Sequence, residues 1–180
     1  GGYVARAADC VACHTSDKSR PYAGGVEFAT PFGKLYSTNI TQDRRYGIGG
    51  FTDKEIVGAI RNGISHAGRH LYPAMPYTSY SGMSDKDVIG LVAYLRTIKP
   101  IDWEPPANRM SFPFNQRWAM AFWNVLNFKS ARQIEDPARS PQWNRGAYLV
   151  QTLAHCQECH SPRNLLQGLT TPALSGGAVG

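Results

Sequence analysis

The sequence predicts an all-α, loop-rich fold made of two tandem units, of which the second is incomplete. Two helix signals and one repeated motif support this prediction. A capping box starts at Thr52 and another helix start lies at Ser84, and apolar residues at helical spacing follow each. The pattern Cys-x-x-Cys-His occurs at residues 10–14 and again at residues 156–160. We therefore expect two related helical units joined by a connector.

The repeated motif is the attachment signature of c-type haem. In the first copy, Cys10 and Cys13 are placed to form thioethers with the haem vinyl groups, and His14 to ligate the iron. The second copy supplies the same three residues, Cys156, Cys159 and His160. The chain has 4 cysteines, and these motifs use all of them. We therefore predict two covalently bound haem c groups, with iron ligated by His14 and His160.

Two other uses of paired cysteines compete with haem attachment. Two Cys-x-x-Cys pairs can supply a tetrahedral zinc site, although such a site does not require a histidine directly after the second cysteine. A thioredoxin-like redox pair follows a strand in a βαβ unit, and the sequence predicts no such unit. Haem attachment is the better interpretation of both copies.

The composition is that of a globular protein. The chain has 180 residues, of which 42% are hydrophobic and 18% charged. Its net charge of +6 suits docking onto an acidic partner, whereas scattered Lys and Arg give no platform for nucleic acid. No apolar run reaches the roughly 18 residues of a membrane-spanning helix. Because c-type haem is attached outside the cytoplasm, we expect that a leader peptide preceded residue 1.

The first unit is predicted to span residues 1–100. A short helix leads into the first motif, and residues 21–50 are interpreted as loops because turn and cap residues interrupt them so often. The two capped helices follow. The first is expected to end near Gly63, and the second before Pro100.

Met75 is the candidate sixth ligand of the first haem iron. It lies in a loop between the two capped helices, flanked by prolines that hold its backbone stiffly. A thioether opposite a histidine raises the reduction potential and closes the iron to other ligands. Met83, just before a helix cap, is the alternative. We interpret His66 and His70 as polar loop residues rather than ligands.

Residues 101–140 are predicted to form a connector. Prolines interrupt it, and an aromatic, largely apolar run covers residues 118–128. One interpretation is a helix packed between the haem units. The other is a docking surface for a partner or for the membrane interface.

Residues 141–180 repeat the start of the first unit. The sequence before Cys156 is similar to that before Cys10 with one residue inserted, and residues 174–177 are similar to residues 22–25. The repeat stops before the later helices and the methionine. We therefore expect a truncated second unit, part of a longer polypeptide, and predict no distal ligand for its haem.

Several segments together resemble the multihaem, typically trihaem, cytochrome c subunit of bacterial membrane-bound alcohol, aldehyde, gluconate and fructose dehydrogenases. They are residues 5–15, 22–25, 30–41, 46–52 and 71–77. The resemblance covers essentially the whole chain. It implies tandem haem domains of the class I cytochrome c type, with a third haem in the full-length protein.

The resemblance also implies an electron-transfer role without substrate chemistry. A dehydrogenase catalytic subunit would pass electrons through the haems to ubiquinone, a quinol oxidase or another terminal acceptor. The location implied is periplasmic, on the outer face of the inner membrane and in contact with the membrane surface. By match to the family motif, Cys10, Cys13, His14 and Met75 belong to the first haem. A backbone carbonyl near Pro21 is expected to accept the N–H of the proximal imidazole.

Two other functions remain open at this point. A dihaem peroxidase would need one haem iron with an open coordination position, and rapid peroxide turnover would favour it. A soluble electron carrier would be isolated without a large dehydrogenase subunit.

Overall fold

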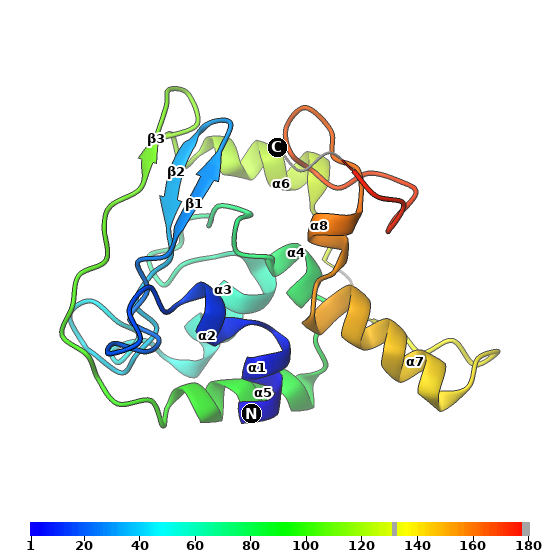
Figure 1. The fold of residues 1–180 in the computed structure, drawn as a ribbon, viewed down its shortest axis with the longest axis horizontal. Helices are drawn as coiled ribbons and strands as arrows, with labels where there is room; N and C mark the ends of the chain where they lie inside the picture. The colour runs from blue at the N-terminus through cyan, green and yellow to red at the C-terminus, as the bar shows by residue number, and fades with distance from the viewer. Residues whose placement is uncertain (131–132, 178–180) are drawn as a thin grey trace.

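The structure is a computed structural model that describes residues 1–130 and 133–177. In chain order the elements are the helices α1 (Gly2–Ala7) and α2 (Cys10–Cys13), the strands β1 (Glu27–Thr30) and β2 (Gly33–Tyr36), the helices α3 (Asp53–Asn62), α4 (Tyr77–Tyr80) and α5 (Asp85–Leu95), the strand β3 (Arg109–Met110), the helices α6 (Ala119–Asn127) and α7 (Pro141–Tyr148), the π-helix η1 (Leu149–Leu153) and the helix α8 (Gln157–His160). Figure 1 shows α1 to α5 gathered together, with the strands projecting beyond them and α7 and α8 along another side.

Both helices predicted from their caps are present, as α3 and α5. The Thr52 hydroxyl accepts the backbone N–H of Glu55 (3.3 Å), and the Glu55 carboxylate accepts the N–H of Thr52 (2.7 Å). Gly63, left-handed with φ 61°, ends α3 at the predicted place. At the start of α5 the Ser84 hydroxyl accepts the N–H of Asp87 (3.1 Å).

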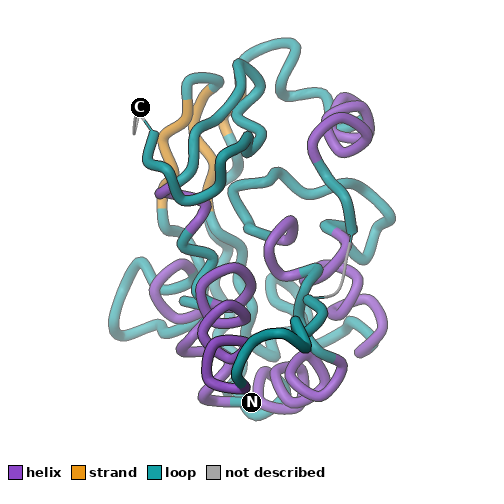
Figure 2. Tube along the Cα trace, turned by 90° about the vertical axis from the view of Figure 1, so that its right-hand side faces the viewer, coloured by secondary structure: helices purple, strands orange, loops and turns teal. Residues whose placement is uncertain are grey.

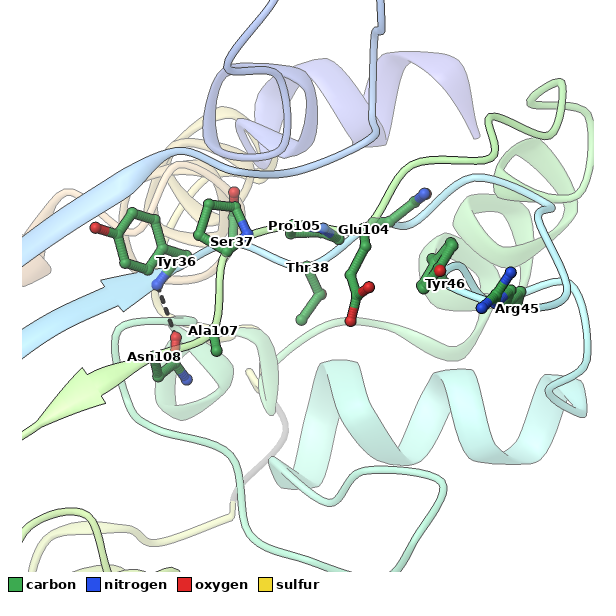
Figure 3. Close-up of a pocket in the computed structure, with 11 residues that line it drawn as sticks. Tyr36, Ser37, Thr38, Arg45, Tyr46, Glu104, Pro105, Ala107 and Asn108 are labelled. Carbon is green, nitrogen blue, oxygen red and sulfur yellow. Dashed lines mark hydrogen bonds between the residues drawn. The ribbon is translucent and has the colours of Figure 1, made fainter.

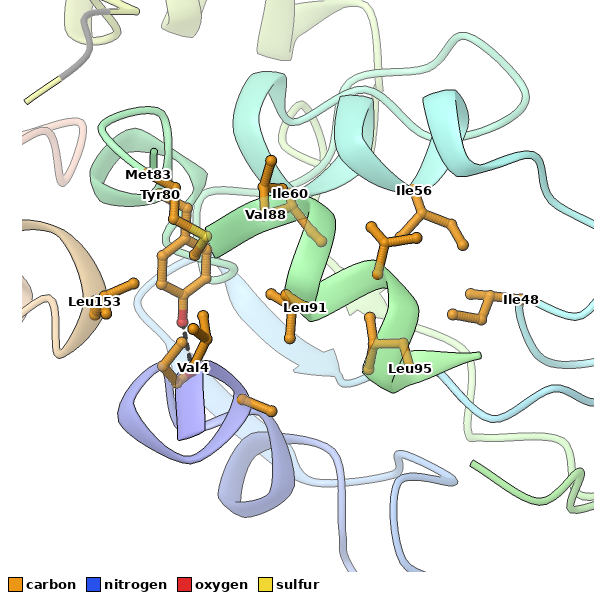
Figure 4. Packing of buried hydrophobic residues seen from close by; sticks show 13 residues of the cluster. Val4, Ile48, Ile56, Ile60, Tyr80, Met83, Val88, Leu91, Leu95 and Leu153 are labelled. Atoms are coloured by element: carbon orange, nitrogen blue, oxygen red, sulfur yellow. Dashed lines mark hydrogen bonds between the residues drawn. The ribbon is translucent and has the colours of Figure 1, made fainter. Parts of the chain in front are cut away.

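The main core forms around α5, which packs against α1 and α3, while η1 packs against α1 and α4. Figure 4 shows its principal buried residues, which include Val4, Ile56, Ile60, Tyr80, Met83, Val88, Leu91, Leu95 and Leu153. Leu153 precedes the second motif in the chain and is fully buried. Its burial fixes the approach to the second motif against the first unit.

A three-stranded antiparallel sheet corrects the expectations of an all-α fold and of loops throughout residues 21–50. β1 and β2 form a hairpin in which Thr30 pairs with Gly33 across a two-residue turn. The Thr30 hydroxyl donates to the Gly33 carbonyl (2.7 Å) and accepts the N–H of Phe32 (3.2 Å). β3 comes from the connector and pairs Met110 with Gly33. Figure 2 shows the strands together in one part of the molecule, among long loops. Each strand is short, and β3 lies far from the other two in the sequence. The frequent turn residues therefore hid the alternating pattern by which a strand is predicted.

The aromatic run of the connector forms α6. Its buried residues, Met120, Trp123 and Asn124, belong to the face that packs around the fully buried Tyr77. This face of α6 is therefore packed against the residues around Tyr77. Other residues of the run are at least 65% exposed, namely Trp118, Phe122, Val125 and Leu126. Within the described residues, neither α6 nor any other helix has the length and apolar character needed to span a bilayer.

Candidate haem sites

The first motif forms one helical turn, α2, directly after a left-handed residue, Asp9 (φ 49°). Cys10 and Cys13 are three residues apart on this turn, so they lie on the same face. Neither cysteine forms a disulfide. Burial, and after it the neighbouring Cys13, raises the pKa of Cys10 to about 12, and burial also raises the pKa of Cys13. Redox-active dithiols need a lowered thiol pKa, so this environment disfavours a thioredoxin-like role.

The structure does not bring the two cysteine pairs together. In residues 1–130 and 133–177, no three His, Cys, Asp or Glu side chains gather closely enough to hold a metal ion. The described part of the chain therefore contains no zinc site shared by the two motifs.

One backbone hydrogen bond orients the imidazole of His14. Its Nδ1 lies 2.7 Å from the carbonyl oxygen of Thr38. Because a carbonyl can only accept, Nδ1 carries the proton and Nε2 keeps a free lone pair. Burial lowers the pKa of His14, which favours the neutral form that ligates metals. The acceptor is therefore the Thr38 carbonyl, which corrects the expectation of one near Pro21. The carbonyl of Tyr22, next to Pro21, accepts the N–H of Ile40 (2.9 Å).

The loop that carries Thr38 is anchored by the next residue, Asn39, which is 2% exposed. Its Oδ1 accepts the N–H (2.9 Å) and the hydroxyl (2.7 Å) of Thr41. Its Nδ2 donates to the carbonyls of Ile101 (2.9 Å) and Trp103 (3.1 Å). Sequence reasoning missed this role, because a buried Asn in a loop has no periodic pattern.

A hollow of about 330 Å³ lies between this loop and the connector (Figure 3). Thr38 and Arg45 line it from the first unit, and Glu104 lines it from the connector. Beside it the N–H of Tyr36 donates to the side-chain oxygen of Asn108 (2.8 Å). The connector thus supports, from outside, the loop that orients His14.

The structure separates the two candidate methionines by their surroundings. Met75 is half-buried and packs at the edge of the main core, as Cys10 does. Met83 is fully buried inside that core. His66 stacks on Phe51 with ring centroids 4.2 Å apart, and His70 is hydrogen-bonded to α6. Met83 is thus a packing residue, whereas Met75 lies at the edge of the same core that Cys10 contacts.

The approach to the second motif repeats the approach to the first. His155, directly before Cys156, is left-handed with φ 40°, as Asp9 is before Cys10. The π-helix η1 lies upstream, and its register continues into the hydrogen bond from the Ala154 N–H to the Leu149 carbonyl (2.8 Å). A π-turn accommodates one additional residue within a helix. It therefore absorbs the insertion that the sequence comparison of the two copies shows.

The chain leaves both motifs in the same way. The carbonyl of His14 accepts the N–H of Gly24 (2.7 Å), and the carbonyl of His160 accepts the N–H of Gly176 (2.8 Å). Both glycines are left-handed, with φ 82° and 84°. A Cβ on Gly24 would lie 2.5 Å from the backbone of Thr38, so this position needs glycine. His160 itself is exposed, unlike the half-buried His14.

Glu158, inside the second motif, ties that motif to α4. Its side chain is 12% exposed and accepts from the hydroxyls of Thr78 (2.9 Å) and Ser79 (3.1 Å). It also forms an ion pair with Arg163 (2.9 Å). The second motif therefore contacts the helix that follows the Met75 loop in the chain. Sequence reasoning did not identify Glu158, because the two middle positions of the motif carry no signature.

The cytochrome c family model matches residues 1–99. The chain belongs to the cytochrome c family. Covalently bound haem c is the cofactor of this family, in agreement with the motif chemistry.

Three relatives confirm the resemblance stated from the motifs. One of the subunits of nicotinate dehydrogenase from Pseudomonas putida is 53% identical over 166 residues, which are 92% of this cytochrome and 14% of that protein. The fructose dehydrogenase cytochrome subunit of Gluconobacter japonicus is 42% identical over 181 residues, covering 99% and 37%. A diheme cytochrome c-type protein of Cereibacter sphaeroides is 38% identical over 163 residues, covering 88% and 55%. The cytochrome thus spans between 14% and 55% of the length of these relatives.

Proposed function

We propose that this cytochrome is the electron-transfer part of a dehydrogenase complex and performs no substrate chemistry of its own. The observation that carries the proposal is the pair of haem motifs with matching backbone geometry at both ends. A relative named as a fructose dehydrogenase cytochrome subunit supports the assignment to a dehydrogenase.

In this proposal Cys10 and Cys13 would hold the first haem covalently, and His14 and Met75 would supply the ligands of its iron. The second is held by Cys156 and Cys159, with His160 as its axial ligand. The residues fit this group, because the Nδ1 of His14 is satisfied by Thr38 while its Nε2 remains available. When bound, haem iron supplies a centre that alternates between the ferric and ferrous states. The chain's own residues fix the orientation of His14.

We further propose two haem domains in tandem. The first spans residues 1–100, the connector residues 101–140, and the second begins in residues 141–180. The shared left-handed residue before each motif and the shared glycine contact after it support a common origin of the two units. Two haem c groups then belong to this chain, and a third to the full-length protein.

An electron-transfer role is favoured over a dihaem peroxidase. A peroxidase needs an open iron position, whereas His14 and Met75 occupy both axial positions of the first haem in this proposal. The exposed apolar residues of α6 disfavour a soluble carrier, because freely diffusing proteins rarely expose large apolar patches to water.

The proposed partners are a dehydrogenase catalytic subunit as the electron source and ubiquinone or a quinol oxidase as the acceptor. The proposed location is the periplasm, at the outer face of the inner membrane. The net charge of +6 is compatible with docking on an acidic surface.

The proposed membrane contact is the exposed apolar side of α6. Trp118 and Phe122 contact each other there edge to face, with ring centroids 6.0 Å apart. The chain has no acidic residue between Glu104 and Glu135, while Arg109, Arg117 and Lys129 fall in that interval. Aromatic and aliphatic residues on a helix with basic residues near it in the chain suit an anionic lipid surface.

Purification from the native source tests the proposal. The haem-loaded full-length protein, isolated with its co-purifying subunits, should show its c-type haems reduced when the substrate of the co-purifying dehydrogenase is added. Peroxide turnover together with a high-spin ferric haem would instead support the peroxidase. Isolation without any large subunit would support a soluble carrier.

A further inference from the structure

The loop that carries Met75 is held at both ends by a single side chain of the connector. Asn124, on the buried face of α6, accepts the hydroxyl proton of Tyr77 at its Oδ1 (2.7 Å). Its Nδ2 lies 2.9 Å from the Nδ1 of His70. His70 and Tyr77 stand on either side of Met75 in the sequence. The Asn124 amide therefore bonds to both ends of the loop.

The geometry fixes the polarity of this contact. Because the Tyr77 hydroxyl donates to Oδ1, the amide Nδ2 is left to donate to His70, whose Nδ1 then acts as an acceptor. Tyr77 is fully buried and Asn124 is 9% exposed, so water does not readily replace the bond between them. Loss of the amide would leave the buried Tyr77 hydroxyl and the half-buried His70 ring without these partners.

Neighbouring residues of the connector reinforce the same loop. The Arg117 guanidinium donates to the His70 carbonyl (3.1 Å) and stacks over the ring of Tyr72 at 4.0 Å. The Tyr72 hydroxyl donates to the carbonyl of Phe114 (2.8 Å). In these contacts the connector bonds to the loop at His70, at Tyr72 and at Tyr77. The Asn124 amide is the group among them that bonds to both ends of the loop.

We propose that Asn124 is a positioning residue that holds the Met75 loop in the conformation in which its thioether reaches the first haem iron. The inference rests on the proposed role of Met75 as the axial ligand. The connector then does more than link two haem units, since it sets how firmly the ligand of the first one is held. Release of the loop would expose the iron to external ligands and lower the reduction potential of the haem.

The test uses the haem-loaded full-length protein and carbon monoxide binding to its reduced haems. A Met75→Ala variant calibrates full opening of the first haem. In Asn124→Leu, which keeps an apolar side chain of similar size, we expect carbon monoxide affinity at that haem to rise roughly tenfold. The potential of the first haem should fall in parallel. Tyr77→Phe, which removes one of the two hydrogen bonds, should shift both readouts in the same direction by less.

Asn127→Leu is the matched control, because Asn127 lies one turn further along α6 and bonds to Asn164 (2.8 Å) rather than to the Met75 loop. Wild-type carbon monoxide binding and potential in both Asn124→Leu and Tyr77→Phe would overturn the inference, even if their thermal stability falls. If Asn124→Leu fails to mature, Tyr77→Phe alone decides. If Met75→Ala matches the wild type, the assignment of Met75 in the proposed function fails instead.

Discussion

At the scale of single residues, one hydrogen bond decides what His14 can do. The Nδ1–H of His14 donates a hydrogen bond to the Thr38 carbonyl, and burial lowers the pKa of the ring, so the neutral imidazole presents Nε2. Sequence alone identified His14 from the motif but placed its acceptor near Pro21. The true acceptor depends on a loop held by Asn39, and that contact joins parts of the chain that no local pattern links.

Exchange of the two methionines separates ligand from packing residue. Met75→Leu should open the first haem iron, remove the sulfur-to-iron absorption band in the visible spectrum and lower the reduction potential. Met83→Leu is a volume-conserving change in the core and should cost less than about 1.5 kcal/mol of stability while leaving the spectrum intact. Visible spectroscopy and redox titration of both variants check this. A normal spectrum in Met75→Leu and an altered one in Met83→Leu would reverse the assignment.

Removal of the Asn39 amide should loosen the loop that orients His14. Asn39→Ala leaves Thr41 and two connector carbonyls without their partner, so we expect a loss of about 2–3 kcal/mol in unfolding free energy. Guanidinium denaturation of the haem-loaded protein measures it. Asn115→Ala, at an exposed asparagine, is the control and should change stability by less than about 0.5 kcal/mol. Equal stability of the two variants would contradict the role given to Asn39.

At the scale of elements, the capped helices were predictable and the sheet was not. Thr52 and Ser84 predict the starts of α3 and α5, because each cap and the apolar residues of its helix lie within a few residues of each other. β1 and β2 are four residues long, and β3 joins them from the connector. The buried face of α6 was one of two interpretations of its aromatic run, since composition alone does not say which residues are covered.

The exposed face of α6 should bind anionic lipid. Leu126 is 70% exposed there, and Leu126→Ser should weaken binding of the haem-loaded protein to phosphatidylglycerol-containing vesicles roughly tenfold. Ile89→Ser is the control, because Ile89 is 64% exposed on α5 and lies outside α6. Vesicle co-sedimentation compares the two. Equal vesicle binding by both variants would contradict a lipid-binding role of this face. So would a dimer, detected by sedimentation equilibrium, that dissociates only in Leu126→Ser.

At the scale of the whole molecule, α4 lies between the two haem motifs. The Tyr80 hydroxyl donates to the Ala8 carbonyl (2.7 Å) just before the first motif, and its ring meets His155 edge to face at 5.6 Å. From within the second motif, Glu158 accepts hydrogen bonds from Thr78 and Ser79 of α4. The contacts of α4 with the two motifs form a joint between them. This joint was not predictable from the sequence, because it depends on how two distant copies of one motif pack together.

Loss of Glu158 should weaken this joint. Glu158→Ala removes the acceptor of Thr78 and Ser79 and the partner of Arg163, which we expect to cost about 2 kcal/mol locally. Hydrogen exchange in residues 141–160 should accelerate while exchange in α5 stays unchanged. Glu135→Ala, at an exposed glutamate of the connector, serves as the control and should leave both segments unchanged. An equal acceleration of hydrogen exchange in residues 141–160 and in α5 of Glu158→Ala would contradict a local joint.

Peptide mass spectrometry of the protein from its native source, with its pyridine haemochrome spectrum, tests the central claim most directly. We expect one haem attached covalently to the peptide with Cys10 and Cys13, and another to the peptide with Cys156 and Cys159. Free thiols in both peptides together with the absence of c-type absorption, or zinc held by these sulfurs, would contradict the account.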